Sequence, residues 1–196
     1  MLLFVYGGPL SRAYYGVSSA IASVVAYSSS LAFALYPKLL AGAKSDDVTL
    51  SLRMVLMFAM PMLIGAIILS EDLLLTLNPA YGAASPILII LALSSLFASL
   101  SSIFESIIMG VENFDAVAKV SFRRAFKSNL FLLLTLQYVQ AAIILPPIYL
   151  ALSLSSESLL SALYFALISC IGDFITMMIR LFIARRSMPL IMPWAG

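Results

Sequence analysis

Long apolar stretches, separated by short polar or proline-containing segments, make up most of the 196-residue sequence. A bilayer core of about 30 Å is crossed by about 20 apolar residues in helical form. Five stretches meet or nearly meet this length, at about residues 14–36, 54–77, 86–110, 130–152 and 159–184. The pattern predicts an all-α, polytopic membrane helix bundle in which residues 1–196 form a single integral domain.

Prolines and acidic residues mark the ends of these spans. The first span is expected to stop at Pro37-Lys38, because a proline moves the preceding residue away from helical dihedrals. The second is interrupted by Ser70-Glu71-Asp72, so it either spans narrowly or continues as an interfacial turn at 73–77, and we favour the turn. Pro86 suits a first helical turn, whereas Pro146-Pro147 is expected to bend or end the fourth helix.

Residues 1–13 are too short to span and contain Gly7-Gly8-Pro9. They lack the basic region and the cleavage site of a signal peptide. We therefore expect them to be the tail of a hydrophobic element whose beginning is absent.

The composition excludes several functional classes. Hydrophobic residues make up 63% of the chain and charged residues 10%. So few charges cannot coat a water-soluble domain. There is no histidine, Cys170 is the single cysteine, and no Walker, GxGxxG, HExxH or CxxC motif occurs. We therefore expect no enzyme activity, no metal and no cofactor, and the net charge of +2 does not suggest a nucleic-acid partner.

Positive charges alternate between the predicted loops. Because cytoplasmic loops near span ends collect Lys and Arg, this alternation predicts orientation. Ten of the eleven Lys and Arg residues fall on one side of the predicted membrane, and only Arg12 lies on the other. The ten are Lys38, Lys44, Arg53, Lys119, Arg123, Arg124, Lys127, Arg180, Arg185 and Arg186. We predict a multi-pass protein of the cytoplasmic membrane, with an outside N-terminus and a cytoplasmic C-terminus.

Ionisable and amide groups at membrane depth are the candidate site residues, because each is costly in hydrocarbon unless paired or hydrated. Asp173 lies about 21 Å along the fifth span and is the strongest candidate. Gln137 and Gln140 lie near the middle of the fourth span and are expected to bond to substrate, to Asp173 or to a neighbouring helix. Arg180 and Glu105 are expected to reach the inner interface and to serve structural roles.

Two spans contain features of packing or bending. Small residues at four-residue spacing in the first span, Ala22, Ala26 and Ser30, favour close helix packing over the lining of a wet cavity. In the second span, Pro61 and Gly65 predict a kink that is either a transporter hinge or an ordinary feature of a membrane helix.

The spacing of residues 14–115 resembles that of the polysaccharide flippases, in the multidrug, oligosaccharidyl-lipid and polysaccharide exporter superfamily. The resemblance lies in AFALYPKLLAGAKSD and in PMLIGAIILSEDLLLTLNPAYGAASPILIILALSSLFASLSSIFESIIMGVENFD. A helix ends in Pro37-Lys38 before a basic loop, and the next helix contains Pro61. An outer turn, Tyr81-Gly82-Ala83-Ala84, and a later turn, Gly110-Val111-Glu112, then follow.

This resemblance implies a transporter of lipid-linked oligosaccharide, of which the chain would supply about half. Family members have two lobes, so a chain with one bundle would need a partner lobe or a second copy of itself. The phosphate groups of such a cargo favour cationic side chains, for which Arg12, Arg53 and Arg180 are the candidates.

The alternative function is a non-transporting membrane subunit or scaffold. Such a protein would use its small-residue helices to pack against another membrane protein. Convergence of Gln137, Gln140, Asp173 and the first-span serines on one cavity would favour transport over this alternative.

The topology is testable by cysteine labelling from outside the cell. With the N-terminus outside, we expect labelling at positions in 71–83 and 153–157 and protection at 113–127, because the last segment carries the cytoplasmic basic cluster. The reverse pattern of labelling would contradict the predicted orientation.

Overall fold

The computed structural model describes residues 2–30, 45–111, 129–155 and 157–187, and within these ranges the ordered elements are all helical. The elements are α1 (Leu2–Ala26), η1 (Tyr27–Ser29), α4 (Ser45–Ile68), α5 (Ser70–Leu77), η2 (Pro79–Ala84), α6 (Ser85–Val111), α8 (Asn129–Leu154) and α9 (Ser158–Ser187). The all-α prediction is therefore confirmed for the described part of the chain.

Four segments among the described residues are long and apolar enough to cross a bilayer, which identifies a membrane protein. They are Val48–Ile68, Pro79–Met109, Phe131–Leu154 and Ser158–Arg186. They correspond to the second to fifth predicted spans. The last part of the first predicted span, at 31–36, lies outside the described residues, as do most of the predicted basic loops, at 37–44 and 112–128.

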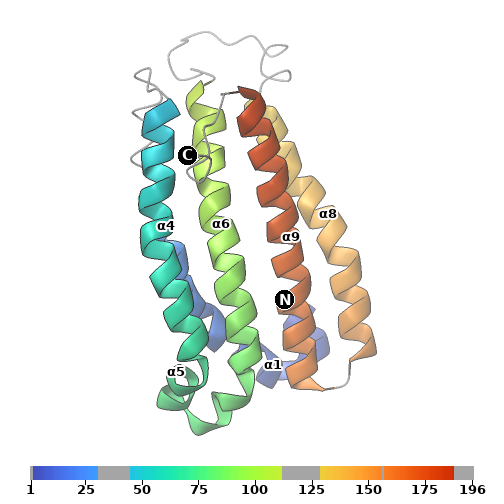
Figure 1. Ribbon diagram of the computed structural model, residues 1–196. Coiled ribbons are helices and arrows are strands. Elements are labelled where there is room, and N and C mark those ends of the chain that lie inside the picture. Colours follow the sequence, from blue (N-terminus) through green and yellow to red (C-terminus); the bar gives the residue numbers. More distant parts are fainter. Residues whose placement is uncertain (1, 31–44, 112–128, 156, 188–196) are drawn as a thin grey trace.

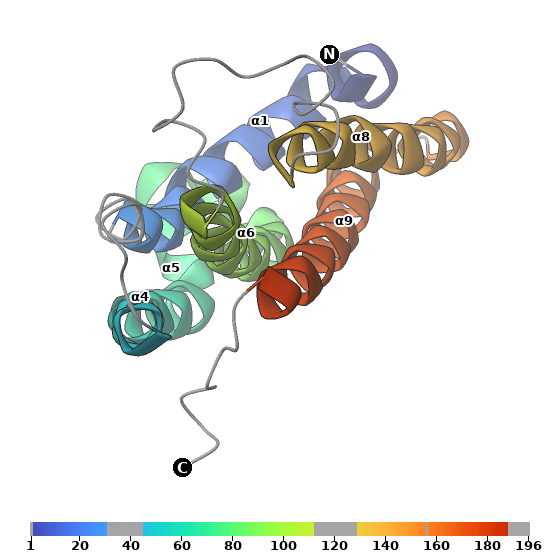
Figure 2. The same cartoon turned by 90° about the horizontal axis from the view of Figure 1, so that it is seen from above.

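Helix α6 is the centre of the bundle. In Figure 1, α4, α6, α9 and α8 stand side by side in that order, and Figure 2 shows α1 running obliquely across them. Helix α6 packs most extensively on α9 and then on α1. Of the apolar window of α6, 56% is buried inside the protein, against 17% for α8. The core therefore follows α6, and α8 lies at the edge against α9.

Helix α1 begins at Leu2, so part of the segment before residue 14, expected to be a separate tail, is helical and continues into the helix of the first predicted span. Gly8 has a φ of 77°, and Pro9 follows it. L side chains rarely adopt this conformation, which glycine adopts freely. Two helical segments therefore meet at a kink, because proline is compatible with the start of the second segment. The Gly-Pro pair bends the helix without ending it.

The small residues of α1 pack against α6. Ala22 and Val25 are fully buried in the cluster that also contains Ile87 and Leu88. Ser28 is buried as well, and its hydroxyl lies 3.4 Å from that of Ser99 on α6. Of the small residues expected to pack closely, Ala22 is therefore buried, whereas Ala26 is half-buried and Ser30 is exposed.

The second predicted span divides at Leu69, where α4 ends and the short helix α5 begins. The favoured turn at 73–77 is therefore part of a separate helical element, and α4 itself starts at Ser45, earlier than predicted. The Asn78 side chain accepts a hydrogen bond from the Ala80 backbone N–H at 2.9 Å, and Pro79 starts η2. The hydroxyls of Ser70 and Ser85 lie 2.7 Å apart and join the ends of this connection.

Helix α8 continues past Pro146 and Pro147 to Leu154, so the prolines do not end it. Each proline removes one backbone hydrogen bond, which membrane helices tolerate where neighbouring helices pack against them. Ile148 and Leu152 are buried with Phe165 of α9, and this packing holds the last turns of α8 in place.

Close packing of α8 on α9 depends on Gly172, and this dependence is testable. A Cβ atom at Gly172 would overlap with Cδ1 of Ile144, whereas one at Gly65 would meet open space. We expect Gly172→Ala to cost about 1–3 kcal/mol of stability through overpacking. The Gly65→Ala control should be neutral or slightly stabilising, because alanine favours helix.

The thermal midpoint of the detergent-solubilised protein measures both effects. Adding Ile144→Val to Gly172→Ala removes the overlapping methyl group and should restore part of the lost midpoint. A Gly172→Ala protein that melts with the Gly65→Ala control would contradict the proposed close approach.

Candidate functional site

Polar residues lie on one face of each of three neighbouring helices. Residues separated by three, four or seven positions share a helix face. The residues that follow this spacing are Ser94, Ser101 and Glu105 on α6, Gln137 and Gln140 on α8, and Asp173, Thr176 and Arg180 on α9. Since α9 packs on both α6 and α8, these faces meet inside the bundle.

Asp173 lies at the centre of this polar group. The Ser94 hydroxyl donates a short hydrogen bond to Oδ2 of Asp173, and the Gln140 side-chain N–H donates to Oδ1 at 3.3 Å. The distance from Gln140 is at the long end for a hydrogen bond, so this contact is the weaker of the two. The structure therefore brings together Asp173 and Gln140 as the sequence suggested, and adds Ser94.

Arg180 forms an ion pair inside the bundle. Its Nη1 lies 2.8 Å from Oε2 of Glu105 and donates a hydrogen bond to the Ser101 hydroxyl at 3.0 Å. The Arg180 side chain is 9% exposed, so the prediction that it extends away to the inner interface is wrong. A guanidinium has donors on three nitrogens and is costly to desolvate. Pairing with a carboxylate on the adjacent helix is therefore more favourable for Arg180 than extending to the membrane edge.

A polar cavity of about 310 Å³, which is open to the outside of the bundle at the exposed residues Ala98 and Gln137, lies between Asp173 and Arg180. Its lining residues come from all three helices: Ala98, Ser101, Gln137, Gln140, Asp173, Thr176 and Arg180. Thr176 donates its hydroxyl to the Gly172 carbonyl at 2.9 Å, and Nε of Arg180 is buried without a hydrogen-bond partner. Amide, hydroxyl, carboxylate and guanidinium side chains therefore line one cavity.

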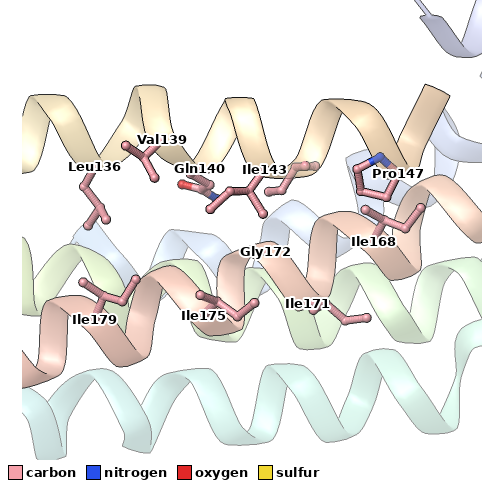
Figure 3. A pocket seen from close by; sticks show the side chains of 11 residues that line it. Leu136, Val139, Gln140, Ile143, Pro147, Ile168, Ile171, Gly172, Ile175 and Ile179 are labelled. Carbon is pink, nitrogen blue, oxygen red and sulfur yellow. The ribbon is translucent and has the colours of Figure 1, made fainter. Parts of the chain in front are cut away.

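A second, apolar groove follows the contact between α8 and α9 (Figure 3). It has a volume of about 120 Å³, and six isoleucines line it: Ile143, Ile144, Ile168, Ile171, Ile175 and Ile179. Gln140 is the one polar side chain among the described residues that line it, and it also lines the polar cavity.

The other candidate residues lie elsewhere. Arg12 on α1 and Arg53 on α4 are exposed, and neither lines the polar cavity. Pro61 and Gly65 lie within the continuous helix α4. The hypothesis that they form a transporter hinge stays a prediction. Two serines of the first predicted span are buried, and neither lines the cavity. Ser28 bonds to the Val25 carbonyl and contacts α6, whereas the buried Ser18 hydroxyl has no hydrogen-bond partner.

The sequence interpretation missed Ser94, Ser101 and Thr176, and it did not pair Glu105 with Arg180. A signal was available in the spacing, because Ser94, Ser101 and Glu105 fall on one face of a single helix. Serines are frequent in these spans, however, so their identity alone does not separate the cavity from ordinary helix contacts.

Among the described residues, no group of three or more His, Cys, Asp or Glu side chains could hold a metal ion. Comparisons with protein-family models, with curated proteins and with solved structures found no match to this chain.

The ion pair between Arg180 and Glu105 generates a stability prediction. Replacing either partner by leucine leaves the other charge unpaired and should cost about 3 kcal/mol, whereas the double leucine variant should recover much of that loss. A double-mutant cycle on the thermal midpoint of the solubilised protein measures the coupling. Additive losses in the double variant would contradict a direct interaction.

Proposed function

We propose that this chain is part of a membrane transporter whose polar cavity receives the hydroxyl-bearing part of a lipid-linked carbohydrate, as in the flippases that its sequence resembles. The observation that carries the proposal is the convergence of Asp173, Gln137 and Gln140 on one cavity among α6, α8 and α9, where Arg180 joins them in place of the expected first-span serines. Ionisable groups within apolar spanning segments are costly and are most often retained for a ligand or a pathway.

The cavity favours transport over a purely scaffolding role. In a scaffold, each polar side chain would be satisfied by a neighbouring helix and close packing would leave no space. Here a volume of about 310 Å³ remains. It falls at the lower end of the range of about 300–1,000 Å³ for small-molecule sites. The Asp173 and Arg180 contacts satisfy part of the polar group, and Gln137 and Thr176 line the cavity beside them.

The chemistry of the lining suits a carbohydrate. Amide and hydroxyl side chains both donate and accept hydrogen bonds, as sugar hydroxyl groups do. Gln137, Gln140, Ser101 and Thr176 supply such groups around the carboxylate of Asp173. A head group with several hydroxyls would form hydrogen bonds with these side chains in place of the hydrogen bonds with water that it loses.

Alternating access would need a second bundle beside this one. In transporters built from repeats, one bundle moves against another around a site at the membrane midplane. Helix α8 borders the cavity and is largely unburied, with 17% of its apolar window covered. We therefore propose that a second copy of this chain, or a separate partner lobe, completes the transport path.

The test compares two neutralised carboxylates. Asp173→Asn keeps the side-chain shape but removes a charge in the cavity, and it should lower glycan display at the cell surface about tenfold, the effect of losing a charge-assisted hydrogen bond of about 1.5–3 kcal/mol. Glu157→Gln makes the same chemical change at an exposed position before α9 and should leave display unchanged.

Display is measured on intact cells, together with the amount of each variant in the membrane fraction. Normal display by Asp173→Asn at a normal protein level would contradict the proposal. It would favour the scaffold alternative, in which Asp173 serves only to join α9 to α6 and α8.

A further inference from the structure

One exposed face of α8 carries polar and small side chains. Helix α8 packs mainly on α9 and is the outermost helix of the row in Figure 1. Gln137, Tyr138 and Ala141 are exposed on it, and Leu145, one turn beyond Ala141, is 50% exposed. Residues three or four positions apart share a helix face, so these four side chains form one surface, here called the Gln137 face.

The amide of Gln137 lies at membrane depth. The apolar segment of α8 begins at Phe131, so Gln137 is about 9 Å inside it at 1.5 Å per residue. Among the described residues, its side chain has no hydrogen-bond partner. An unpaired amide is costly in hydrocarbon, and glutamines in spanning helices bond to neighbouring helices. The Gln137 face is therefore better suited to another helix than to lipid.

Helix α1 covers the same side of α8 further along. Ile148 lies eleven positions, or about three turns, beyond Gln137, and so on the same side of the helix. It is buried together with Leu152, and Tyr15 of α1 packs against them. Because α1 runs obliquely across the bundle (Figure 2), it covers this end of α8 and leaves the Gln137 face open.

The open side of the polar cavity lies beside the Gln137 face. Gln137 lines the cavity from α8, and Ala98 lines it from α6. Both residues are exposed, so the cavity opens between these two helices. The small side chains of Ala98 and Ala141 allow the backbone of another helix to approach closely. A helix lying on the Gln137 face would therefore also cover the opening of the cavity.

The chemistry of this face favours a second copy of the chain. A glutamine amide both donates and accepts hydrogen bonds. Two Gln137 side chains related by a two-fold axis therefore satisfy each other, as an isologous interface requires. Residues 129–154 contain no Asp, Glu, Lys or Arg, so α8 offers no charge by which a different partner would be selected.

We propose that α8 of a second copy of this chain packs on the Gln137 face, pairs with it through Gln137 and closes the open side of the polar cavity. This inference rests on the proposed transport function and names the partner that the function needs. Each copy contributes α8 to the wall of the other's cavity, so the site is incomplete in a single copy. The two bundles then lie on either side of a shared path.

Disulfide cross-linking in native membranes tests this contact. In a Cys170→Ser background, Ala141→Cys should form a species of twice the 21.2 kDa mass of the chain when copper phenanthroline is added as the oxidant. Val139→Cys is the matched control, because Val139 is 44% exposed at nearly the same depth but lines the α8–α9 groove. It should give about fivefold less dimer, because a disulfide needs Cα atoms within about 7 Å.

Three results would overturn the proposal. Equal cross-linking of Ala141→Cys and Val139→Cys would indicate random collision. Absence of cross-linking at Ala141→Cys would leave the Gln137 face to lipid. A linked species of any other mass would identify a different protein as the partner.

Replacing the amide measures the contribution of Gln137. Förster transfer between donor- and acceptor-labelled copies in liposomes reports association as the protein-to-lipid ratio is varied. Gln137→Leu should need about a tenfold higher ratio for the same transfer, because two reciprocal hydrogen bonds are lost. Thr135→Val is the control, since the exposed Thr135 hydroxyl already donates to the Phe131 carbonyl at 2.8 Å within α8. Unchanged association in Gln137→Leu would contradict the amide pair.

The association test and the transport test can fail separately. Cross-linking at Ala141→Cys needs no turnover, so the dimer stands if Asp173→Asn cells display glycan normally and the transport proposal falls. Loss of display in Asp173→Asn without cross-linking at Ala141→Cys would retain transport, with a separate partner lobe, and reject the second copy.

Discussion

Hydrocarbon does not solvate a carboxylate or a guanidinium, and α9 carries one of each, Asp173 and Arg180, two turns apart on one face. Both charges must therefore find partners inside the bundle. Asp173 receives hydrogen bonds from Ser94 of α6 and Gln140 of α8, and Arg180 pairs with Glu105 of α6. This requirement sets which faces of the three helices meet, and the cavity is the space between the two charged contacts.

The apolar packing agrees with this arrangement. Helix α1 contacts α6 through small residues of its own, such as Ala22. Because these side chains are small, α1 can lie obliquely across the bundle without separating α6 from α9. On the other side, Gly172 lets Ile144 approach α9 closely enough for Gln140 to reach Asp173. Small residues thus determine where the helices approach, and the polar residues determine how they are rotated.

The sequence predicted the elements better than their contacts. Apolar length located four spanning helices, because a helix that crosses a bilayer needs a long apolar run whatever the fold. The Gly8-Pro9 pair was interpreted as part of a separate tail, whereas it kinks α1. Pro146-Pro147 was expected to bend or end its helix, and α8 continues past both prolines to Leu154. Asp173 was found because a carboxylate in such a span is rare. Its partners depend on helix rotation, which composition does not encode.

Arg180 illustrates the difficulty, because a long cationic side chain near a membrane edge has two favourable destinations, water or a carboxylate on a neighbouring helix. The choice follows from Glu105 lying opposite on α6, a tertiary fact.

The central claim is that α6, α8 and α9 surround a polar cavity. A cavity with this lining should hold water, so thiol reactivity in native membranes tests the claim most directly. In a Cys170→Ser background, Ala98→Cys on the cavity wall should react with a small water-soluble thiol reagent, because a thiolate forms readily only in water. Ala92→Cys, at a fully buried position of the same helix, and Ile64→Cys, facing lipid on α4, should not react. If Ala98→Cys were as unreactive as these two controls, the cavity would be dry and the central claim would be contradicted.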